Sequence, residues 1–170
     1  MNTRVVLDTD FGRGERFAAA RAQGGRLHYI GLAPVLPPAP DGLQDLWPLD
    51  VPGFHRVILD QDATLDLLVG APDAVLPQIR AHVDEFHLGP LAPSHARLLA
   101  GLAVQGAALH ARAADEALVW ALTAAGFACR LAPGVSVDVA TAGVRPAGAV
   151  TAETASAPPD IDAVYRGRMG

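Results

Sequence analysis

A short glycine-bearing loop holds the residues of this chain that are best suited to bind a ligand. It follows the apolar run 4–7 and reads Asp8-Thr9-Asp10-Phe11-Gly12-Arg13-Gly14. Glycines allow the backbone to approach a ligand closely, and the start of a following helix presents free N–H groups. Carboxylates beside them can accept hydrogen bonds from an amine or a hydroxyl. The loop therefore predicts a ligand site, although any turn between a strand and a helix can need glycine for purely structural reasons.

Histidine and cysteine form weaker patterns. The chain has six histidines and one cysteine, and no histidines have the spacing of a helical metal site, so we expect no metal cofactor and no disulfide framework. His87 and His95 flank the Gly89-Pro90 turn at the predicted end of a strand, where α/β proteins bind ligands, but a plain surface role is the alternative. Cys129, in an apolar run, is expected to be a small buried residue. The Gly-x-Ser-x-Gly elbow of serine hydrolases does not occur.

The segments that must position this loop alternate between strand-like and helix-like patterns. Short apolar runs predict strands at residues 4–7, 27–32, 54–59, 64–69, 83–88, 107–110, 127–131 and 135–141. Helices are predicted at residues 15–22, 74–82, 94–104 and 113–125, with Asp73 and Ser94 as N-caps of the second and third. The third and fourth strands, and also the last two, are expected to form hairpins. This order predicts an α/β, Rossmann-like domain with a mostly parallel sheet and a C-terminal antiparallel hairpin.

A proline-rich connection follows the second predicted strand. Six prolines lie between residues 33 and 53, a density that excludes a regular helix or a central strand. We expect an extended connection with one helical turn near residues 43–46. Trp47 is expected to fix it to the core, and Trp120 is expected to be a second core anchor. Residues 34–40 either fill the space above Gly12 and Gly14 or leave it open.

Composition is typical of a single globular domain. The chain has 170 residues, of which 51% are hydrophobic, and no apolar run reaches the roughly 18 residues of a membrane span. Because no signal-peptide pattern is found, we expect a cytoplasmic location. The net charge of −5 does not favour strong RNA or DNA binding by this chain alone. Five arginines among the first 26 residues form either a solvated helix face or a phosphate-binding strip.

Several stretches together resemble one known family. Residues 7–17 are similar to the S-adenosylmethionine (SAM) loop of the MnmC-type methyltransferase domain, which completes the 5-methylaminomethyl group on 2-thiouridine in the tRNA wobble position. Further similar stretches follow in the same order, at Leu27-His28-Tyr29-Ile30, Trp47-Pro48, Pro52-Gly53-Phe54-His55-Arg56, Thr64-Leu65-Asp66-Leu67-Leu68-Val69-Gly70, Val83-Asp84-Glu85-Phe86-His87-Leu88, Leu91-Ala92-Pro93, Ala124-Ala125-Gly126-Phe127 and Ala132-Pro133-Gly134. The resemblance runs from about residue 4 to residue 143.

The resemblance implies a fold, a cofactor and a substrate. It implies the class I SAM-dependent methyltransferase fold for residues 1–143, and the composition of residues 144–170 predicts a mobile Pro- and Ala-rich tail. SAM is the implied cofactor, without metal or FAD, because the family's FAD-dependent oxidase domain has no counterpart here. The expected partner is tRNA or a separate tRNA-modifying protein. The implied cofactor-binding residues are Asp8, Thr9, Asp10, Phe11, Gly12 and Gly14.

Three positions depart from the family pattern. Ala33 stands where the family has an acid suited to the ribose hydroxyls of SAM, and Ala71 stands where an acid can contact the adenine amine. Gly89 replaces the active-site Asp of the family's Leu-Asp-Gly-Phe-Ala-Pro motif, so no catalytic residue is assigned. The connection after the second strand is also shorter than is usual in the family.

Nearby polar residues offer incomplete replacements for these acids. Asp73 is a candidate for the adenine contact, whereas Glu85 and His87 share a strand face with Gly89 and so do not inherit its reach. A lost charged hydrogen bond, worth roughly 1.5–3 kcal/mol, predicts weaker SAM binding. Two hypotheses remain. The chain is an MnmC-like tRNA N-methyltransferase with reduced or lost activity, or it is a non-catalytic pseudo-methyltransferase that acts as a binding or scaffold module.

Overall fold

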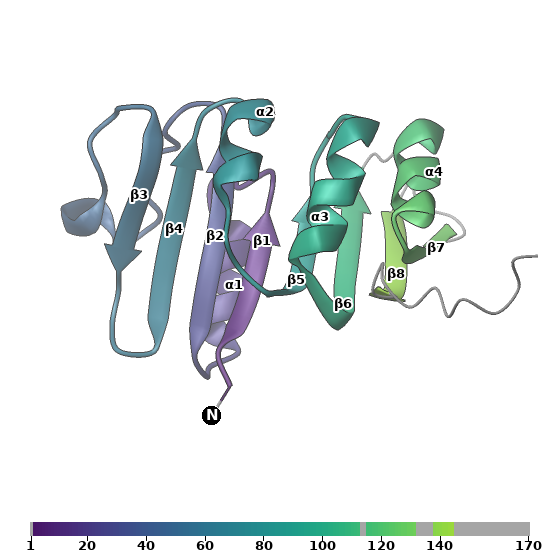
Figure 1. The fold of residues 1–170 in the computed structure, drawn as a ribbon. Helices are drawn as coiled ribbons and strands as arrows, with labels where there is room; N and C mark the ends of the chain where they lie inside the picture. Colours follow the sequence, from purple (N-terminus) through teal and green to yellow (C-terminus); the bar gives the residue numbers. More distant parts are fainter. Residues whose placement is uncertain (1, 113–114, 132–137, 145–170) are drawn as a thin grey trace, which may run out of the picture.

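An eight-stranded sheet runs through the computed structural model, which describes residues 2–112, 115–131 and 138–144. Its order is β3-β4-β2-β1-β5-β6-β8-β7. The strands are β1 (Arg4–Asp8), β2 (Leu27–Ala33), β3 (Gly53–Ile58), β4 (Ala63–Val69), β5 (Val83–Leu88), β6 (Ala103–Arg112), β7 (Phe127–Leu131) and β8 (Asp138–Val144). One face carries α1 (Glu15–Ala22), and the other carries α2 (Pro72–Val75), α3 (Ala96–Leu102) and α4 (Glu116–Ala124) (Figure 1). The predicted α/β architecture is confirmed.

The central strands are parallel, and both ends of the sheet are antiparallel. β1 pairs in parallel with β2 and β5, β2 pairs with β4, and β5 pairs with β6. β3 is antiparallel to β4, and β8 is antiparallel to β6 and β7, so both predicted hairpins are confirmed. The chain leaves β1 towards β2 on one side and later returns to β5 on the other. The strand order therefore reverses at β1 and β5, the place where open α/β sheets bind ligands.

Side-chain alternation along the strands divides the core into two layers. Val6 and Tyr29 pack with Phe17 of α1. Leu7 and Ile30, their neighbours in the chain, belong to the opposite layer, which also contains residues of α2, α3 and α4. Because the inner strands are covered on both faces, they read as continuous apolar runs, and this was the signal that located them in the sequence.

The proline-rich connection is extended, with one helical turn at η1 (Gln44–Leu46), as predicted. Trp47 is half-buried beside the ring of Phe11, at 6.4 Å between ring centroids. Its indole Nε1 donates to the carbonyl of Pro37 at 2.8 Å. Trp47 therefore fixes the connection to the core, as expected.

The second helix is much shorter than predicted. Instead of spanning 74–82, α2 ends at Val75 and a 3-10 turn, η2 (Leu76–Gln78), follows. Pro77 explains the early end, because proline has no N–H to donate to the carbonyl four residues back and its ring clashes with that carbonyl. Asp73 is not the N-cap, since Ala71 occupies that position without a side-chain hydrogen bond.

The third helix is also shorter than predicted, and the strand after it is longer. Residues 93–95 form a 3-10 turn (η3, Pro93–His95) and α3 ends at Leu102, so Ser94 is not its N-cap. β6 begins at Ala103, not at 107, and its register with β5 is irregular. Gly106, at φ 82°, provides a backbone conformation that other residues rarely adopt in a strand. Pairing with β5 therefore overrides the local preference for helix at residues 103–104.

The last helix and the last pair of antiparallel strands are present with bounds that differ from the prediction, because α4 begins at Glu116 and β8 runs on to Val144. Asp115 caps α4 by accepting a hydrogen bond from the Leu118 N–H at 2.7 Å, and Gly126, at φ 109°, follows its end. Trp120 lies on the outward side of α4 and is 69% exposed, so the prediction of a second core anchor is wrong. Val144 still belongs to β8. The predictions for residues 113–114, 132–137 and 145–170 lie outside the described residues.

Candidate functional site

The predicted ligand loop lies at the carboxyl ends of β1 and β5, where the strand order reverses. It is tied to β5, because the Thr9 N–H donates to the carbonyl of His87 at 2.9 Å. Gly12 and Gly14 have φ angles of 59° and 82°, the left-handed conformation that favours glycine. The loop therefore has the strand–turn–helix geometry that its motif requires.

Asp8 is fully buried, and its carboxylate is occupied by donors of the chain itself. Arg16 of α1 donates from Nε and Nη2, each at 2.9 Å. The Tyr29 hydroxyl donates at 2.7 Å and the Asp10 N–H at 2.9 Å. Burial and the nearby charge of Asp8 raise the pKa of Tyr29, and the hydrogen bond to Asp8 raises the pKa of Arg16. Four hydrogen bonds fill the acceptor sites of this carboxylate, so it has none left for a ligand.

Arg16 and Tyr29 are the residues of this cluster that sequence reasoning missed. A signal was present, because a carboxylate at the end of a buried strand needs a charged or hydrogen-bonded partner. Several arginines lie near Asp8 in the sequence. Which of them reaches it depends on the path of the loop, and only the structure shows that path.

Phe11 fills the space over the end of β2. Its N–H donates to the carbonyl of Leu32 at 3.0 Å, and the residue is only 2% exposed. The ring packs against Phe17 and Tyr29, at 6.3 and 6.2 Å between centroids. A Cβ atom at Gly31 would lie 2.4 Å from the Cδ2 atom of the Phe11 ring. Phe11 is therefore a core residue whose ring rests directly on the β2 backbone.

Asp10 gives a steric reason for the missing side chain at position 89. A Cβ atom at Gly89 would lie 2.5 Å from the Cβ atom of Asp10 and 3.1 Å from its Cγ. Gly89 is buried, and its N–H donates to the Thr9 hydroxyl at 3.0 Å. Asp10 is exposed, and its carboxylate makes no direct hydrogen bond within the described part of the chain. Position 89 therefore has no acid, but Asp10, in the loop after β1, lies beside it.

The other two departures place alanine where the family has an acid. Ala33 is buried at the end of β2, and Ala71 precedes α2. Asp73, the candidate replacement, is engaged by His95, with 2.7 Å between Oδ1 and Nε2. His95 is 8% exposed, so the alternative of a plain surface histidine is wrong for this residue.

Glu85 and His87 share one face of β5, as predicted, and are bonded to each other. The His87 Nε2 lies 2.9 Å from the Glu85 Oε1, and the His87 ring stacks on His110 of β6 at 5.3 Å between centroids. The hydrogen bond from His87 lowers the pKa of Glu85, although partial burial opposes the shift. These side chains therefore form a small cluster of their own on the sheet.

Most of the N-terminal arginines are paired with acids. The pairs are Arg16 with Asp8 at 2.9 Å, Arg21 with Asp60 at 3.0 Å, Arg26 with Asp62 at 3.6 Å and Arg4 with Glu85 at 4.0 Å. Arginines that neutralise the chain's own carboxylates do not form a free strip for phosphates. The structure therefore favours a solvated surface, with most of its arginines paired to acids, over a phosphate-binding strip.

The proline-rich connection packs against the outer side of the loop. A Cβ atom at Gly14 would lie 3.0 Å from the Cγ atom of Pro40. A hollow of about 530 Å³ lies here, between Arg13 and Glu15 on one side and residues 38–41 on the other. Pro40 therefore packs against Gly14, while a hollow stays open between the loop and residues 38–41.

The backbone of the glycine loop is suited to SAM, whereas the side chains around it are not. The glycine turn allows close approach, but the Asp8 carboxylate is fully bonded, the Phe11 ring covers Gly31, and Ala33 offers no carboxylate. Within residues 2–112, 115–131 and 138–144, no group of three His, Cys, Asp or Glu side chains could hold a metal ion. No helix in these same ranges is long and apolar enough to cross a bilayer.

Comparison with known proteins agrees with the resemblance seen in the sequence, although no protein-family model matches the chain. The tRNA 5-methylaminomethyl-2-thiouridine biosynthesis bifunctional protein MnmC of Thiobacillus denitrificans is 30% identical over an alignment of 199 positions. The alignment covers 98% of this chain and 32% of that protein. The protein of the same name from Ralstonia nicotianae is 32% identical over 163 residues, which cover 76% of this chain and 25% of that protein. The chain is an MnmC homologue. It spans about a quarter to a third of the length of these relatives.

Solved structures show the fold of this MnmC homologue. The crystal structure of MnmC2 from Aquifex aeolicus matches with a TM-score of 0.64 at 14% identity, covering 84% of this chain and 53% of that one. The antibiotic-resistance methyltransferase Kmr matches with a TM-score of 0.51 at 17% identity, covering 83% and 87%. The expected class I SAM-dependent methyltransferase fold is confirmed.

Proposed function

We propose that this MnmC homologue is a methyltransferase-fold protein of tRNA wobble-uridine modification whose own methyl transfer to a tRNA amine is reduced or lost. The MnmC relatives support the link to 5-methylaminomethyl-2-thiouridine. The fold supports SAM as the ligand that the loop would hold.

The state of Asp8 carries the proposal of reduced activity. An acid at the end of β1 can serve a ligand only through acceptor sites that are not already used. In this chain Arg16, Tyr29 and the Asp10 N–H use them all. A ligand would have to displace donors from a buried carboxylate, which costs free energy that its own contacts must offset.

A non-catalytic binding or scaffold role is the second candidate. Two side chains of the loop favour this role, because they occupy space next to the ends of neighbouring strands. The Phe11 ring rests on Gly31, and Asp10 lies against Gly89. Through these contacts the loop packs directly on the backbone of residues 31 and 89.

Calorimetry with SAM tests the proposal on the 170-residue chain. We expect no saturable heat below about 1 mM SAM, because missing charged hydrogen bonds weaken binding by orders of magnitude. The Thiobacillus MnmC protein, measured in the same buffer, is the positive control. One-to-one binding with a dissociation constant of about 10 μM or tighter would contradict the proposal of a weakened site.

Methyl transfer needs its own measurement. Labelled SAM and tRNA that carries the unmethylated amine should give incorporation at background with this chain and clear incorporation with the MnmC control. Turnover comparable to that of the control would contradict the proposal of reduced activity.

We also propose that the chain works in the cytoplasm with tRNA or with a separate tRNA-modifying protein. The net charge of −5 and the paired N-terminal arginines support dependence on a partner for tRNA contact. A gel-shift titration at about 150 mM salt should show no tRNA complex with the chain alone. A complex at micromolar protein would contradict this dependence.

A further inference from the structure

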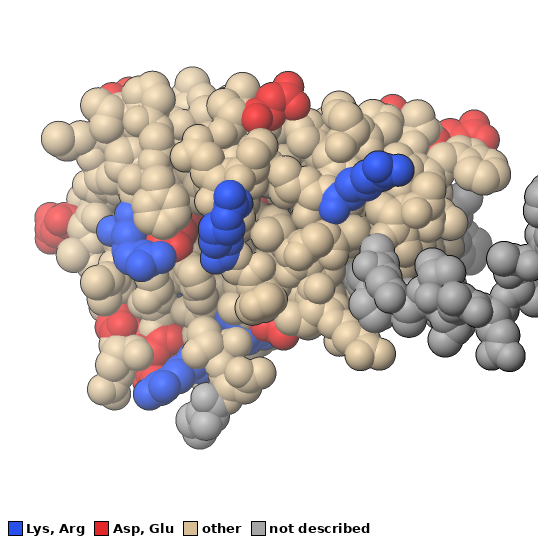
Figure 2. Space-filling model, in the orientation of Figure 1, with Lys and Arg blue, Asp and Glu red and all other residues tan. Residues whose placement is uncertain are grey.

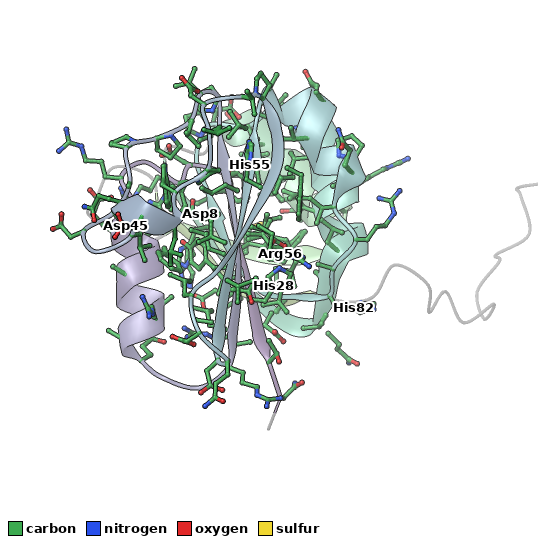
Figure 3. All side chains as sticks on the ribbon, turned by 90° about the vertical axis from the view of Figure 1, so that its left-hand side faces the viewer. Asp8, His28, Asp45, His55, Arg56 and His82 are labelled. Atoms are coloured by element: carbon green, nitrogen blue, oxygen red, sulfur yellow. The ribbon has the colours of Figure 1, made fainter. Side chains whose placement is uncertain are left out.

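A second site lies on the face of the sheet opposite α1. Between the β3–β4 hairpin and residues 78–80 there is a hollow of about 220 Å³, which we call the arginine hollow. Figure 2 shows positive and negative side chains side by side on this face, over β3 and β4. Figure 3 shows Arg56 and His28 together, across the sheet from Asp8. The same separation follows from the contacts, because Asp8 bonds to Tyr29 whereas Asp66 bonds to His28, the preceding residue of β2.

The arginine hollow exists because the chain after β4 does not form a full helix. α2 ends at Val75, and from Ile79 the backbone is extended. A full helix would cover the front of β3 and β4, whereas here Phe54 stays 56% exposed. The floor is formed by Ile30 and Leu68, which are 3% exposed. The hollow therefore has an apolar floor and one aromatic wall.

A buried carboxylate forms the polar base of the hollow. Asp66 is 2% exposed and accepts hydrogen bonds from Arg56 Nε at 2.7 Å and Nη2 at 2.8 Å. His28 Nε2 lies 2.6 Å from its Oδ2. The Arg56 side chain is itself 53% exposed, so the buried carboxylate holds a guanidinium that still faces solvent.

Two guanidinium groups keep donors available at the rim of the hollow. Arg56 uses Nε and Nη2 for Asp66, which leaves Nη1 without a partner in the described part of the chain. Arg80 uses Nη1 for two backbone carbonyls, those of Pro77 and Ile79, which leaves Nε and Nη2. The two arginines outweigh the single negative charge of Asp66. The guanidinium of Arg56 also lies 5.6 Å from the centroid of the Phe54 ring, which is within the range of a cation–π contact.

We propose that the arginine hollow binds a small aromatic anion, a planar ring that carries one phosphate or carboxylate group. The ring lies on Ile30 and Leu68 beside Phe54, and the anion accepts hydrogen bonds from Arg80 and from Nη1 of Arg56. The hollow is large enough only for a ligand of about one ring and its anionic group. Because it lies across the sheet from the glycine loop, this inference does not depend on the proposed function.

Phenyl phosphate is the probe for the test, titrated into the full chain and followed by amide chemical shifts and by calorimetry. We expect saturable one-to-one binding with shifts confined to β3, β4 and residues 78–80. The variant Arg80→Gln removes one charged donor from an exposed side chain and should weaken binding about tenfold or more. Arg97→Gln, which changes an exposed arginine of α3 outside the hollow, is the matched control and should bind as the parent does.

Two further probes separate the parts of the site. Inorganic phosphate should bind at least about tenfold more weakly than phenyl phosphate, because it lacks the apolar ring. Benzoate shows whether a carboxylate serves as well as a phosphate. The proposal is overturned by the absence of saturable phenyl phosphate binding up to about 10 mM. It is equally overturned if Arg80→Gln binds like the parent, or if inorganic phosphate binds as tightly as phenyl phosphate.

Discussion

Two buried carboxylates, Asp8 and Asp66, are each held by an arginine and by a second side chain. Their partners differ in character. Asp8 is enclosed under α1 with the Tyr29 hydroxyl, whereas Asp66 lies at the floor of a hollow with His28. Around Asp8, donors of the chain itself use all the acceptor sites of the carboxylate. Around Asp66, arginine donors still face solvent. At the scale of single residues, burial of an acid therefore does not by itself indicate a ligand site.

The Tyr29 hydroxyl should contribute measurably to stability. Tyr29→Phe removes one donor from a carboxylate that stays buried, so we expect the free energy of unfolding to fall by about 1–3 kcal/mol in urea denaturation. Thr123→Val is the control, because it removes a hydroxyl from the exposed side of α4 and should cost little. Equal losses in the two variants would contradict the role given to Tyr29.

Asp66 should make the stability depend on pH. Burial opposes its ionisation, but the hydrogen bonds and charges of Arg56 and His28 outweigh burial and hold the pKa below its usual value. Its contribution is therefore present above the unfolded-state pKa, near pH 4, and is lost as the pH falls towards the lower folded-state pKa. Asp66→Asn should flatten the fall in unfolding free energy between about pH 5 and pH 3. Asp45→Asn, at an exposed acid, should keep the parent profile.

At the scale of elements, prolines and strand pairing shift the ends of the middle helices. Pro77 ends α2 after Val75, and pairing with β5 draws Ala103 into β6. The early end of α2 has a consequence for function, because it leaves the arginine hollow uncovered.

The N-cap of α4 offers a test at this scale. Asp115→Ala removes the acceptor for the Leu118 N–H and should lower the free energy of unfolding by about 1 kcal/mol. Asp115→Ser keeps an oxygen at the cap and should recover most of the loss. Chemical denaturation of both variants checks this, and an equal loss in Asp115→Ser would show that the cap is not the cause.

At the scale of the whole molecule, exposed apolar side chains gather at one end of the sheet. Five of the seven large apolar side chains that are exposed in the described residues fall within residues 46–58, namely Leu46, Leu49, Val51, Phe54 and Ile58. β3 is the edge strand there and pairs regularly with β4, so its outer backbone groups have no strand beside them. Such an edge favours association of copies at high concentration.

Ile58→Lys should therefore reduce concentration-dependent association, because a lysine on an edge strand opposes pairing between copies. Light scattering over a concentration series measures the effect. Val35→Lys is the matched control, since Val35 is 69% exposed and Ile58 is 67% exposed, but Val35 lies outside the edge strand. If both variants reduce scattering equally, charge and not the edge explains the change.

The sequence predicted the fold well, but it did not show which contacts the side chains of the loop make. Apolar runs located the strands because buried parallel strands are apolar on both faces. The glycine turn was placed correctly, because only a few backbone conformations join a strand to a helix in this way. Asp8 and Phe11 were expected to face a ligand, yet one is bonded to Arg16 and the other rests on Gly31. These contacts join residues from different strands and helices, so no local pattern contains them.

Sequence by itself determined the α/β order, the extended form of the proline-rich connection and the relation to MnmC, because periodicity, proline and ordered motifs act locally along the chain. Only the tertiary structure decided which donors Asp8 takes, why position 89 holds no side chain beside Asp10, and that Arg56 and Arg80 share a hollow. Hydrogen bonds and steric contacts between elements require interatomic distances that are correct to within a few tenths of an ångström. Those distances are set by the packing of the two layers on the sheet, and not by the local sequence patterns.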